Sequence, residues 1–514
     1  MPTGASLSTT AQTIINITMM MKRFFAAILL AGACTMAFGQ IERPKLVVGF
    51  VVDQMRWDYL YYYYDQYGEG GFKRLLREGF SCENTMINYV PTVTAIGHSS
   101  IYTGSVPALT GIAGNDFMVN GKPMYCVADS TVKSVGSNSK EGLMSPRNLL
   151  ATGIGDMLKV ATDYQAKVFG VALKDRASIL PAGHAANAAY WWDTSAGHFI
   201  TSTYYMNQLP EWVKKFNKTI QVKPGTDVKG VPDGVTKTFQ MAKAVLDNEH
   251  LGEGPVTDML AISISSTDII GHAYGTRGQE NHDVYMRTDE ELAKFLTYLD
   301  SKVGKGNYLF FLSADHGGMH NANVMKQHKI PADGYAAWNE IKPLNAAFKA
   351  KYGIEKVALM ANANRIYLDH AAIAKAGLQL DNVKREVADY LSRNPKVHMV
   401  VDYANAVNAN LPQLIRERIV NGWNPDRSGD LFVVPKPHNV DGVVTPDYRG
   451  TSHGVWNPYD SHIPMVFMGW KVKHGQTSTP TRIVDIAPTV CEMLHIQMPN
   501  ACIGDAVNEI VNPK

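Results

Sequence analysis

The segment Leu46-Val-Val-Gly-Phe-Val-Val52 is a continuous run of apolar residues that ends directly before Asp53. A run in which polar and apolar residues do not alternate is typical of a parallel β-strand buried on both faces of a sheet. Comparable apolar runs occur later in the chain, at residues 168–173, 259–264, 308–312 and 463–468. The first run is therefore predicted to be one strand of a larger buried sheet.

Helical patterns separate these predicted strands. One helix is expected over about 71–78 and a long one over 283–303. Another is expected to start at Ser145 and Pro146, which suit the N-cap and the first position of a helix. Strands that alternate with helices predict an α/β fold, with a mostly parallel central sheet and helices on both faces.

Length and composition limit the domain organisation and the partners. The 514 residues are 45% hydrophobic and 19% charged, which excludes wholesale disorder. We expect a single domain over residues 40–514, with less regular, cap-like insertions at about 180–240 and 320–450. The 49 basic and 47 acidic residues give a net charge of +2, and no basic run is present. No nucleic-acid partner is therefore expected.

Residues 1–39 are expected to be an N-terminal extension followed by a signal peptide at about 21–39. Lys22 and Arg23 precede an apolar run over 24–33, which at about 10 residues is too short to span a bilayer. Small residues follow this run, in the order typical of a secretory signal peptide. The mature chain is thus predicted to be periplasmic or secreted, with no transmembrane segment.

The cysteines and the oligomeric state leave alternatives open. A lipid anchor at Cys34 is disfavoured, because Ala31 stands where a lipoprotein signal would have a larger apolar residue. The four cysteines of the mature chain allow either local disulfides or four buried thiols. The local pairings would be Cys82–Cys126 and Cys491–Cys502. A monomer is favoured, although the sequence does not fix the oligomeric state.

Acidic residues follow three of the predicted strands. Asp53, Asp268 and Asp315 each lie just beyond an apolar run, where ligands bind in open α/β sheets. One such acid is commonly a helix N-cap, but three of them favour a shared cation site. Histidines accompany these acids at His272, at His316 and, in the segment Gly-Thr-Ser-His-Gly, at His453. Mixed oxygen and nitrogen ligands suit zinc better than calcium or magnesium.

A hydroxyl-bearing residue is predicted at a helix start. Thr94 lies in Pro91-Thr-Val-Thr-Ala, where a loop is expected to turn into a short helix. The free N–H groups at a helix N-terminus can bind phosphate, although a threonine there is often only an N-cap. Lys174 and Arg176 are two residues apart, so an extended chain would place both on one face.

These motifs, together with Val484-Asp-Ile-Ala-Pro-Thr489, resemble the alkaline phosphatase superfamily. The resemblance covers nearly the whole mature chain and points to the branch with a threonine nucleophile. This branch is related to the type I phosphodiesterases and nucleotide pyrophosphatases. Gly114-Asn115 and Val171-Ala-Leu-Lys-Asp-Arg176 are similar to its secreted, phosphate-irrepressible monoesterases.

The resemblance implies a two-zinc alkaline phosphatase that hydrolyses small-molecule phosphate monoesters through a phosphothreonine at Thr94. One zinc would be bound by Asp268, His272 and His453. The second would be bound by Asp53, Asp315 and His316, with Thr94 bridging to it as the nucleophile. Asn115, Lys174 and Arg176 would contact the phosphoryl oxygens.

Two other functions remain open. A phosphodiesterase or nucleotide pyrophosphatase could use the same site, but Lys174 and Arg176 favour the extra charge of a monoester. A non-catalytic zinc-binding protein is the less favoured alternative, because the set of ligands and the nucleophile are complete.

Overall fold

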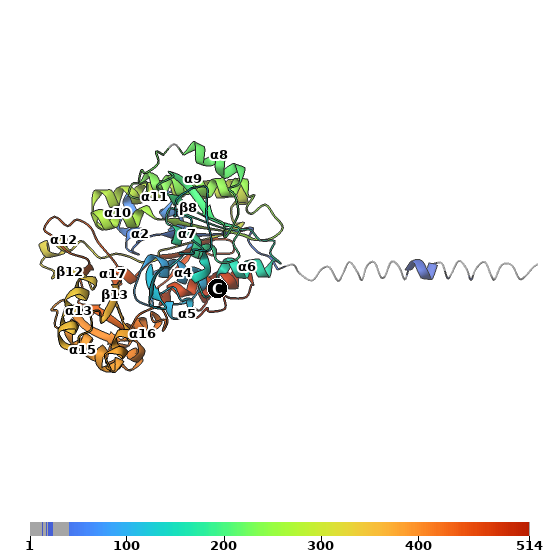
Figure 1. The fold of residues 1–514 in the computed structure, drawn as a ribbon. Helices are drawn as coiled ribbons and strands as arrows, with labels where there is room; N and C mark the ends of the chain where they lie inside the picture. The colour runs from blue at the N-terminus through green and yellow to red at the C-terminus, as the bar shows by residue number, and fades with distance from the viewer. Residues whose placement is uncertain (1–12, 14–16, 18, 24–40, 221, 513–514) are drawn as a thin grey trace, which may run out of the picture. The chain divides into compact units, whose positions relative to one another are not determined.

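The first apolar run forms β1 (Leu46–Val52), which lies in the middle of a large central sheet (Figure 1). The structure is a computed structural model that describes residues 13, 17, 19–23, 41–220 and 222–512. Most of the predicted signal peptide, including Cys34, lies outside the described residues. In the described part of the chain, the sheet has ten strands in the order β19 (Gly475–Thr477), β2 (Phe80–Cys82), β18 (Met465–Gly469), β11 (Tyr308–Ser313), β1, β10 (Asp258–Ile264), β7 (Val168–Ala172), β8 (Ala188–Asp193), β9 (His198–Ser202) and β6 (Ser134–Val135).

The centre of this sheet is parallel. The strands from β11 through β1, β10 and β7 to β8 all run in one direction, and antiparallel pairing begins at β18 and at β9. This arrangement confirms the predicted mostly parallel sheet. The strand expected at 463–468 differs from its prediction, because it begins at Met465 and runs antiparallel to β11.

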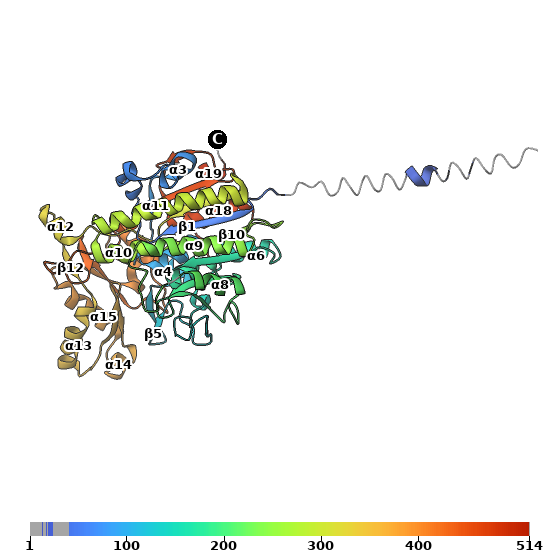
Figure 2. The ribbon, with the colours of Figure 1, turned by 90° about the horizontal axis from the view of Figure 1, so that it is seen from above.

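Helices cover both faces of the sheet, as predicted. Successive residues of β11 show the two faces. The ring centroid of Phe310 lies 5.8 Å from that of Phe50. Phe50 in turn packs on Phe239 of α9 (Asp233–Asn248), with ring centroids 5.5 Å apart. Phe311 instead lies 5.8 Å from Tyr102 of α4 (Thr94–Thr103). The long α11 (Gln279–Leu299) packs on α9, and Figure 2 shows both helices lying along β1.

A second, four-stranded antiparallel sheet lies within residues 320–450, which were expected to be less regular. Its strands follow the order β13 (Ala358–Asn362), β14 (Arg365–Leu368), β16 (Leu431–Pro435) and β15 (Val397–Asp402). It has its own apolar core with α13 (Trp338–Tyr352), α14 (His370–Lys375) and α15 (Leu380–Ser392). Residues 180–240 supply β8 and β9 to the central sheet rather than an irregular stretch. The description of both stretches as cap-like insertions stays a prediction.

The predicted helices are present with shifted ends. The helix expected over 283–303 is α11, which starts at Gln279 and passes into a π-helical turn after Leu299. The helix expected at Ser145 is wrong: Ser145 caps only a 3₁₀ turn, and the α-helix begins at Ile154. The remaining elements are α2 (Tyr59–Tyr62), α3 (Phe72–Glu78), α5 (Pro107–Thr110), α6 (Ile154–Ala161), α7 (Asp175–Ala182), α8 (Glu211–Thr219), α10 (Ser266–Tyr274), α12 (Ala322–Gln327), α16 (Gln413–Asn421), α17 (Pro458–Ser461), α18 (Ile486–Leu494), α19 (Asn508–Val511), β3 (Thr85–Met86), β4 (Asp116–Val119), β5 (Lys122–Tyr125), β12 (Asp333–Tyr335), β17 (Asn439–Asp441) and β20 (Thr481–Arg482).

Two sequence-level expectations concern the covalent state and the membrane. The cysteines that the structure describes, Cys82, Cys126, Cys491 and Cys502, are all free thiols, so neither of the local disulfides is present. Among the described helices, none combines the length and the apolar character needed to cross a membrane.

Candidate metal centre and active site

Three parallel strands end at the same edge of the sheet and bring the predicted acids together. In the register of the sheet, Val52 of β1 pairs with Ile264 of β10, and Val51 pairs with Ser313 of β11. Asp53 and Asp315 follow their strands within two residues, and Asp268 lies in the first turn of α10, directly after β10. The backbone of the sheet therefore places all three carboxylates at one edge.

Asp53, Asp315 and His316 form the first cluster, which we call the Asp53 group. Their ligand atoms lie within 4.8 Å of one another, and all three side chains are fully buried. Asp53 Oδ1, Asp315 Oδ2 and His316 Nε2 have no hydrogen-bond partner among the described residues. Buried polar atoms without partners are rare in folded proteins. Three that converge on one point fit a bound cation.

Electrostatics in the Asp53 group agree with this fit. Burial and the neighbouring carboxylate of Asp315 raise the pKa of Asp53 well above its usual range. Burial acts in the same direction on Asp315, but His316 and His98 outweigh it and lower the pKa of Asp315 below its usual value. Burial lowers the pKa of His316 and so favours the neutral imidazole that a metal needs.

Asp268, His316 and His453 form the second cluster, which we call the Asp268 group. His453 Nε2 lies 3.6 Å from Asp268 Oδ1, and His272 Nε2 lies 3.2 Å from the same oxygen. The structure thus brings the six predicted carboxylate and imidazole ligands together, but His316 belongs to both groups, whereas His272 lies beside the Asp268 group as a neighbour of Asp268. Burial and the adjacent His316 hold the pKa of His453 well below its usual value.

Lys174 and Arg176 lie at the start of α7, which corrects the predicted extended geometry. Lys174 is the N-cap residue, and Arg176 is already in the helix. The buried Lys174 Nζ lies 2.6 Å from Asp53 Oδ2 and 2.6 Å from Asp268 Oδ2, so its ammonium group joins the two groups. Burial opposes this charge, yet Asp268 and Asp53 raise the pKa of Lys174. Arg176 is 3.1 Å from the hydroxyl of Tyr125.

Thr94 is the first residue of α4, as predicted, and is almost fully buried. Close packing of Gly97 holds this helix against the Asp53 group, because a Cβ atom at Gly97 would lie 2.3 Å from the carbonyl oxygen of Asp315. Asn115 Oδ1 accepts a hydrogen bond of 3.0 Å from the N–H of Ala95, in the first turn of the same helix. Thr94 and Asn115 therefore lie at the start of a helix that packs against the Asp53 group.

Sequence reasoning missed two residues of this site. His98 is fully buried, with Nδ1 2.9 Å from the carbonyl oxygen of Thr94 and 3.3 Å from Asp315 Oδ2. Gln54 donates a side-chain hydrogen bond of 2.6 Å to Asp268. Their positions in the sequence hold the signal: His98 lies four residues after Thr94 on a helix, and Gln54 directly follows Asp53.

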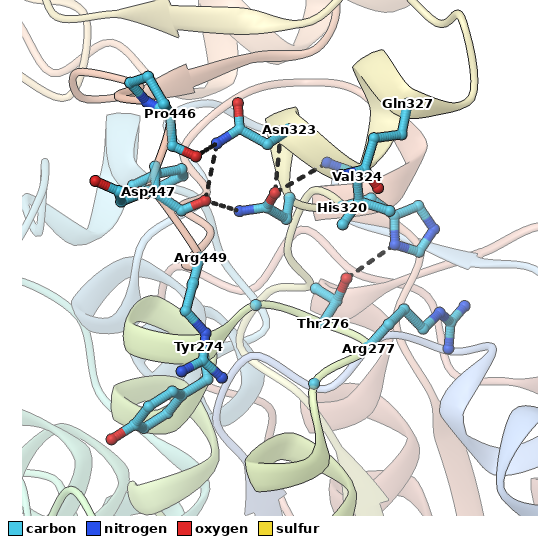
Figure 3. Close-up of a pocket in the computed structure, with 14 residues that line it drawn as sticks. Tyr274, Thr276, Arg277, His320, Asn323, Val324, Gln327, Pro446, Asp447 and Arg449 are labelled. Carbon is cyan, nitrogen blue, oxygen red and sulfur yellow. Dashed lines mark hydrogen bonds between the residues drawn. The ribbon is translucent and has the colours of Figure 1, made fainter.

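A cavity of about 480 Å³ lies along the chain segments that carry the histidines (Figure 3). Its lining residues 274–278 follow His272, residues 320–327 follow His316, and residues 446–449 precede His453. Thr276 Oγ1 lies 2.8 Å from His320 Nδ1, and Figure 3 shows the two side chains facing each other. The main chain of His453's segment also meets α10, where His272 Nδ1 is 2.9 Å from the carbonyl oxygen of Thr451. The cavity is therefore lined by segments that adjoin His272, His316 and His453 in the sequence.

Comparisons with known proteins agree with this architecture. Residues 47–454 match the model of the type I phosphodiesterase / nucleotide pyrophosphatase family. The alkaline phosphatase PafA of Elizabethkingia meningoseptica is 43% identical, over 92% of this chain and 95% of that protein. A protein of Myroides odoratus named calcium-transporting ATPase is 44% identical, over 95% of this chain and 99% of its own.

Solved structures show the same relation. The crystal structure of wild-type PafA superposes with a TM-score of 0.88 at 42% identity, and covers 92% of this chain and 100% of that one. Murine ectonucleotide pyrophosphatase / phosphodiesterase 5 has a TM-score of 0.55 at 16% identity, covers 89% of this chain and 96% of its own, and shares the fold. The chain therefore belongs to the type I phosphodiesterase / nucleotide pyrophosphatase family, in which the relatives that match it over most of its length include alkaline phosphatases.

Proposed function

We propose that the chain is an exported alkaline phosphatase that uses two zinc ions to hydrolyse small-molecule phosphate monoesters through a phosphothreonine at Thr94. The observation that carries this proposal is the Asp53 group: three buried ligand atoms without partners, packed against the helix that begins at Thr94. The relatives named as alkaline phosphatases support the same reaction.

The proposed ligand sets follow the strand ends. Asp53, Asp315 and His316 would bind one zinc ion together with the hydroxyl of Thr94. Asp268, His272 and His453 would bind the other. Carboxylate oxygens and neutral imidazoles are ligands that zinc accepts, and the lowered pKa values of His316 and His453 support their neutral forms. Two such ions, when bound, would stabilise the attacking and leaving oxygens of an in-line displacement.

The chain's own residues supply the rest of the chemistry. The Thr94 hydroxyl attacks phosphorus, and the phosphoryl group passes to this oxygen as the alcohol leaves. The donors for the phosphoryl oxygens are Lys174, Arg176 and the amide of Asn115. The positive charges of Lys174 and Arg176 match the dianion of a monoester. Thr94 is 1% exposed, which limits the access of bulk water to the nucleophile. Water then releases phosphate from Thr94.

The cellular form proposed for the enzyme follows from its N-terminus. Cleavage of a signal peptide at about 21–39 would deliver a periplasmic or secreted chain without a lipid anchor at Cys34. Independently of the N-terminus, a monomer is the proposed oligomeric state.

A rate comparison tests the function. The purified chain is assayed with an aryl phosphate monoester, an aryl phosphate diester and a nucleoside triphosphate, first as isolated, then after EDTA, then with zinc or magnesium added. We expect the monoester to react fastest, EDTA to abolish turnover and zinc, but not magnesium alone, to restore it.

The other outcomes identify the alternatives. Faster hydrolysis of the diester would instead assign a phosphodiesterase. Zinc binding with no hydrolysis of any ester would assign a non-catalytic zinc-binding protein.

A further inference from the structure

Gln54, like Lys174, hydrogen-bonds to an acid of each metal group. Its main-chain N–H donates to Asp315 Oδ1 over 3.1 Å, and its side-chain Nε2 donates to Asp268 Oδ1 over 2.6 Å. Only the amide nitrogen can pair with a carboxylate oxygen, so the chemistry fixes the orientation of the amide. The residue is 4% exposed.

The backbone is shaped to allow this double contact. Gln54 has a φ of 64°, in the left-handed region that residues with a Cβ rarely adopt. Its side chain lies against Gly271 of α10, where a Cβ atom would come within 2.0 Å of Gln54 Oε1. A strained conformation and a glycine at the contact are both needed to bring this amide to Asp268.

The contacts orient the carboxylates of Asp315 and Asp268. Asp315 Oδ1 accepts from the N–H groups of Gln54 and His316, so Oδ2 is the oxygen turned toward Asp53 and His316 Nε2. At Asp268 the arrangement differs. Gln54 Nε2 donates to Oδ1, the oxygen that faces His272 and His453, while Lys174 Nζ donates to Oδ2, so the two donors together fix the rotation of this carboxylate. Groups that orient metal ligands in this way commonly change metal affinity by about 10–100-fold when they are removed.

We propose that Gln54 is a positioning residue that orients one carboxylate of each metal group, through its side chain for Asp268 and through its main chain for Asp315. The inference rests on the proposed function, because it assumes that both groups bind zinc. Because one contact is made by the side chain and the other by the main chain, the two metal groups should respond differently to substitution of Gln54. Removing the side chain removes the contact to Asp268 and leaves the contact to Asp315 intact.

The test is zinc binding to the full chain carrying Gln54→Gly. Glycine keeps the main-chain N–H and accepts the left-handed φ, so this substitution removes only the side-chain hydrogen bond to Asp268. Zinc stoichiometry and affinity are measured by competition with a chelator, and the unfolding temperature is measured without metal. We expect one zinc to bind roughly 10–100-fold more weakly and the other to stay within about threefold of wild type.

A matched control is Asn364→Gly. Asn364 has the same φ of 64° and is 2% exposed, but it lies in the turn between β13 and β14 of the second sheet. This variant should bind both zinc ions as the wild type does. Gln54→Asn, which also tolerates the left-handed φ but is too short to reach Asp268, should reproduce the weakening even if the glycine variant folds poorly.

A double-mutant cycle completes the test. In the Asp268→Ala background, Gln54→Gly should not weaken zinc binding further, because the contact that it removes is already absent. Equal weakening of both sites, no weakening of either, or full additivity with Asp268→Ala would overturn the positioning role. A wild-type chain that binds two zinc ions but cleaves no phosphate ester would overturn the proposed function and leave the role of Gln54 standing. A wild-type chain that binds no zinc would contradict both.

Discussion

The Thr94 hydroxyl is the single group on which the proposed chemistry depends, yet it contributes at most one of the metal contacts. Thr94→Ala should therefore retain zinc while its turnover of a phosphate monoester falls by on the order of 10³-fold or more. Thr94→Ser keeps a hydroxyl at the start of α4 and should retain a large part of the activity. Zinc content is measured by elemental analysis and turnover by phosphate release. A normal rate in the alanine variant would exclude Thr94 as the nucleophile.

The cations at the start of α7 make a separate prediction, about substrate choice. A monoester carries about one more negative charge than a diester, and each charge-assisted hydrogen bond contributes about 1.5–3 kcal/mol. Lys174→Ala/Arg176→Ala should therefore lower kcat/KM for monoesters by roughly 10²–10⁴ and for diesters much less.

Zinc content has to be measured on the same double variant, because Lys174 also balances the charge of Asp53 and Asp268. Arg176→Ala alone leaves that balance intact and serves as the control. A uniform slowing of both ester classes would mean that the two cations do not discriminate between them.

His320 gives a residue-scale prediction about pH. Burial, followed by the charges of Arg56 and Arg277, lowers the pKa of His320 to about 4 from its usual 6.5. Between pH 6.5 and 4 the unfolded chain therefore binds a proton that the folded chain does not, and the free energy of unfolding falls as the pH falls.

The variant His320→Asn keeps a polar atom for Thr276 but does not titrate. It should lose less stability than the wild type between pH 7 and pH 5, by on the order of 1 kcal/mol. Urea unfolding of the metal-free chain measures this difference, with exposed His474→Asn as the control. Identical pH dependence in wild type and His320→Asn would contradict the assignment.

At the scale of elements, α12 is tied to the segment that carries His453. Asn321 Oδ1 caps the helix by accepting from the N–H groups of Asn323 and Val324. Its Nδ2 donates to the carbonyl oxygens of Tyr448 and Gly450, over 3.0 and 2.8 Å. One buried side chain therefore joins two elements.

Replacement of Asn321 should lower the free energy of unfolding by more than the loss of a helix cap alone. Loss of the cap is worth about 0.5–2 kcal/mol and loss of the bonds to buried carbonyls about 1–3 kcal/mol, so Asn321→Ala should lower the free energy of unfolding by roughly 2–4 kcal/mol. Asn321→Asp keeps the cap but loses the donors, and it should be nearly as unstable. Urea unfolding measures both variants.

Asp369→Ala is the matched control, because Asp369 caps α14 in the second sheet. It should lose only the cap and leave zinc affinity unchanged. Wild-type stability in Asn321→Asp would show that the contacts to Tyr448 and Gly450 contribute nothing.

Elements were predictable where burial alone determined them. The strands β1, β10 and β11 are buried on both faces, so their apolar runs identify them without any knowledge of their neighbours. In the second sheet, β13 and β15 are partly exposed, and the buried Arg365 interrupts β14, so no continuous apolar run signals these three strands. The fully buried β16 is such a run, and it was missed. Arg176 was placed on an extended segment because the helix start at Asp175 was not recognised.

At the scale of the whole molecule, the acids were predictable because parallel strands end together, whereas the contacts between distant segments were not. His98 reaches Asp315 only because α4 packs against that strand end, and Gln54 reaches Asp268 only through a left-handed backbone. Their sequence positions place both residues near the site, but neither residue type indicates which acid it contacts. Tertiary packing, rather than local pattern, decides these contacts.

The metal centre should also govern the stability of the whole molecule. Asp53 and Asp315 are fully buried beside each other, and the cation nearest to Asp53 is Lys174. Zinc that binds only the folded chain stabilises it by about 2.7 kcal/mol per site at 100 times the dissociation constant, and by about 4.1 kcal/mol at 1,000 times. Removal of zinc by EDTA should therefore lower the unfolding temperature, and added zinc should raise it again with the logarithm of its concentration.

The double variant Asp53→Asn/Asp315→Asn separates the metal from the fold. It removes both the repulsion between the buried acids and two of the proposed ligands. Without metal it should unfold at a higher temperature than the metal-free wild type, whereas zinc should stabilise it much less than the wild type. The variant should therefore unfold at the higher temperature without zinc, and the wild type at the higher temperature with zinc. Scanning calorimetry at fixed protein concentration can detect this reversal. A wild-type unfolding temperature that does not respond to zinc would show that the buried acids do not form a zinc site.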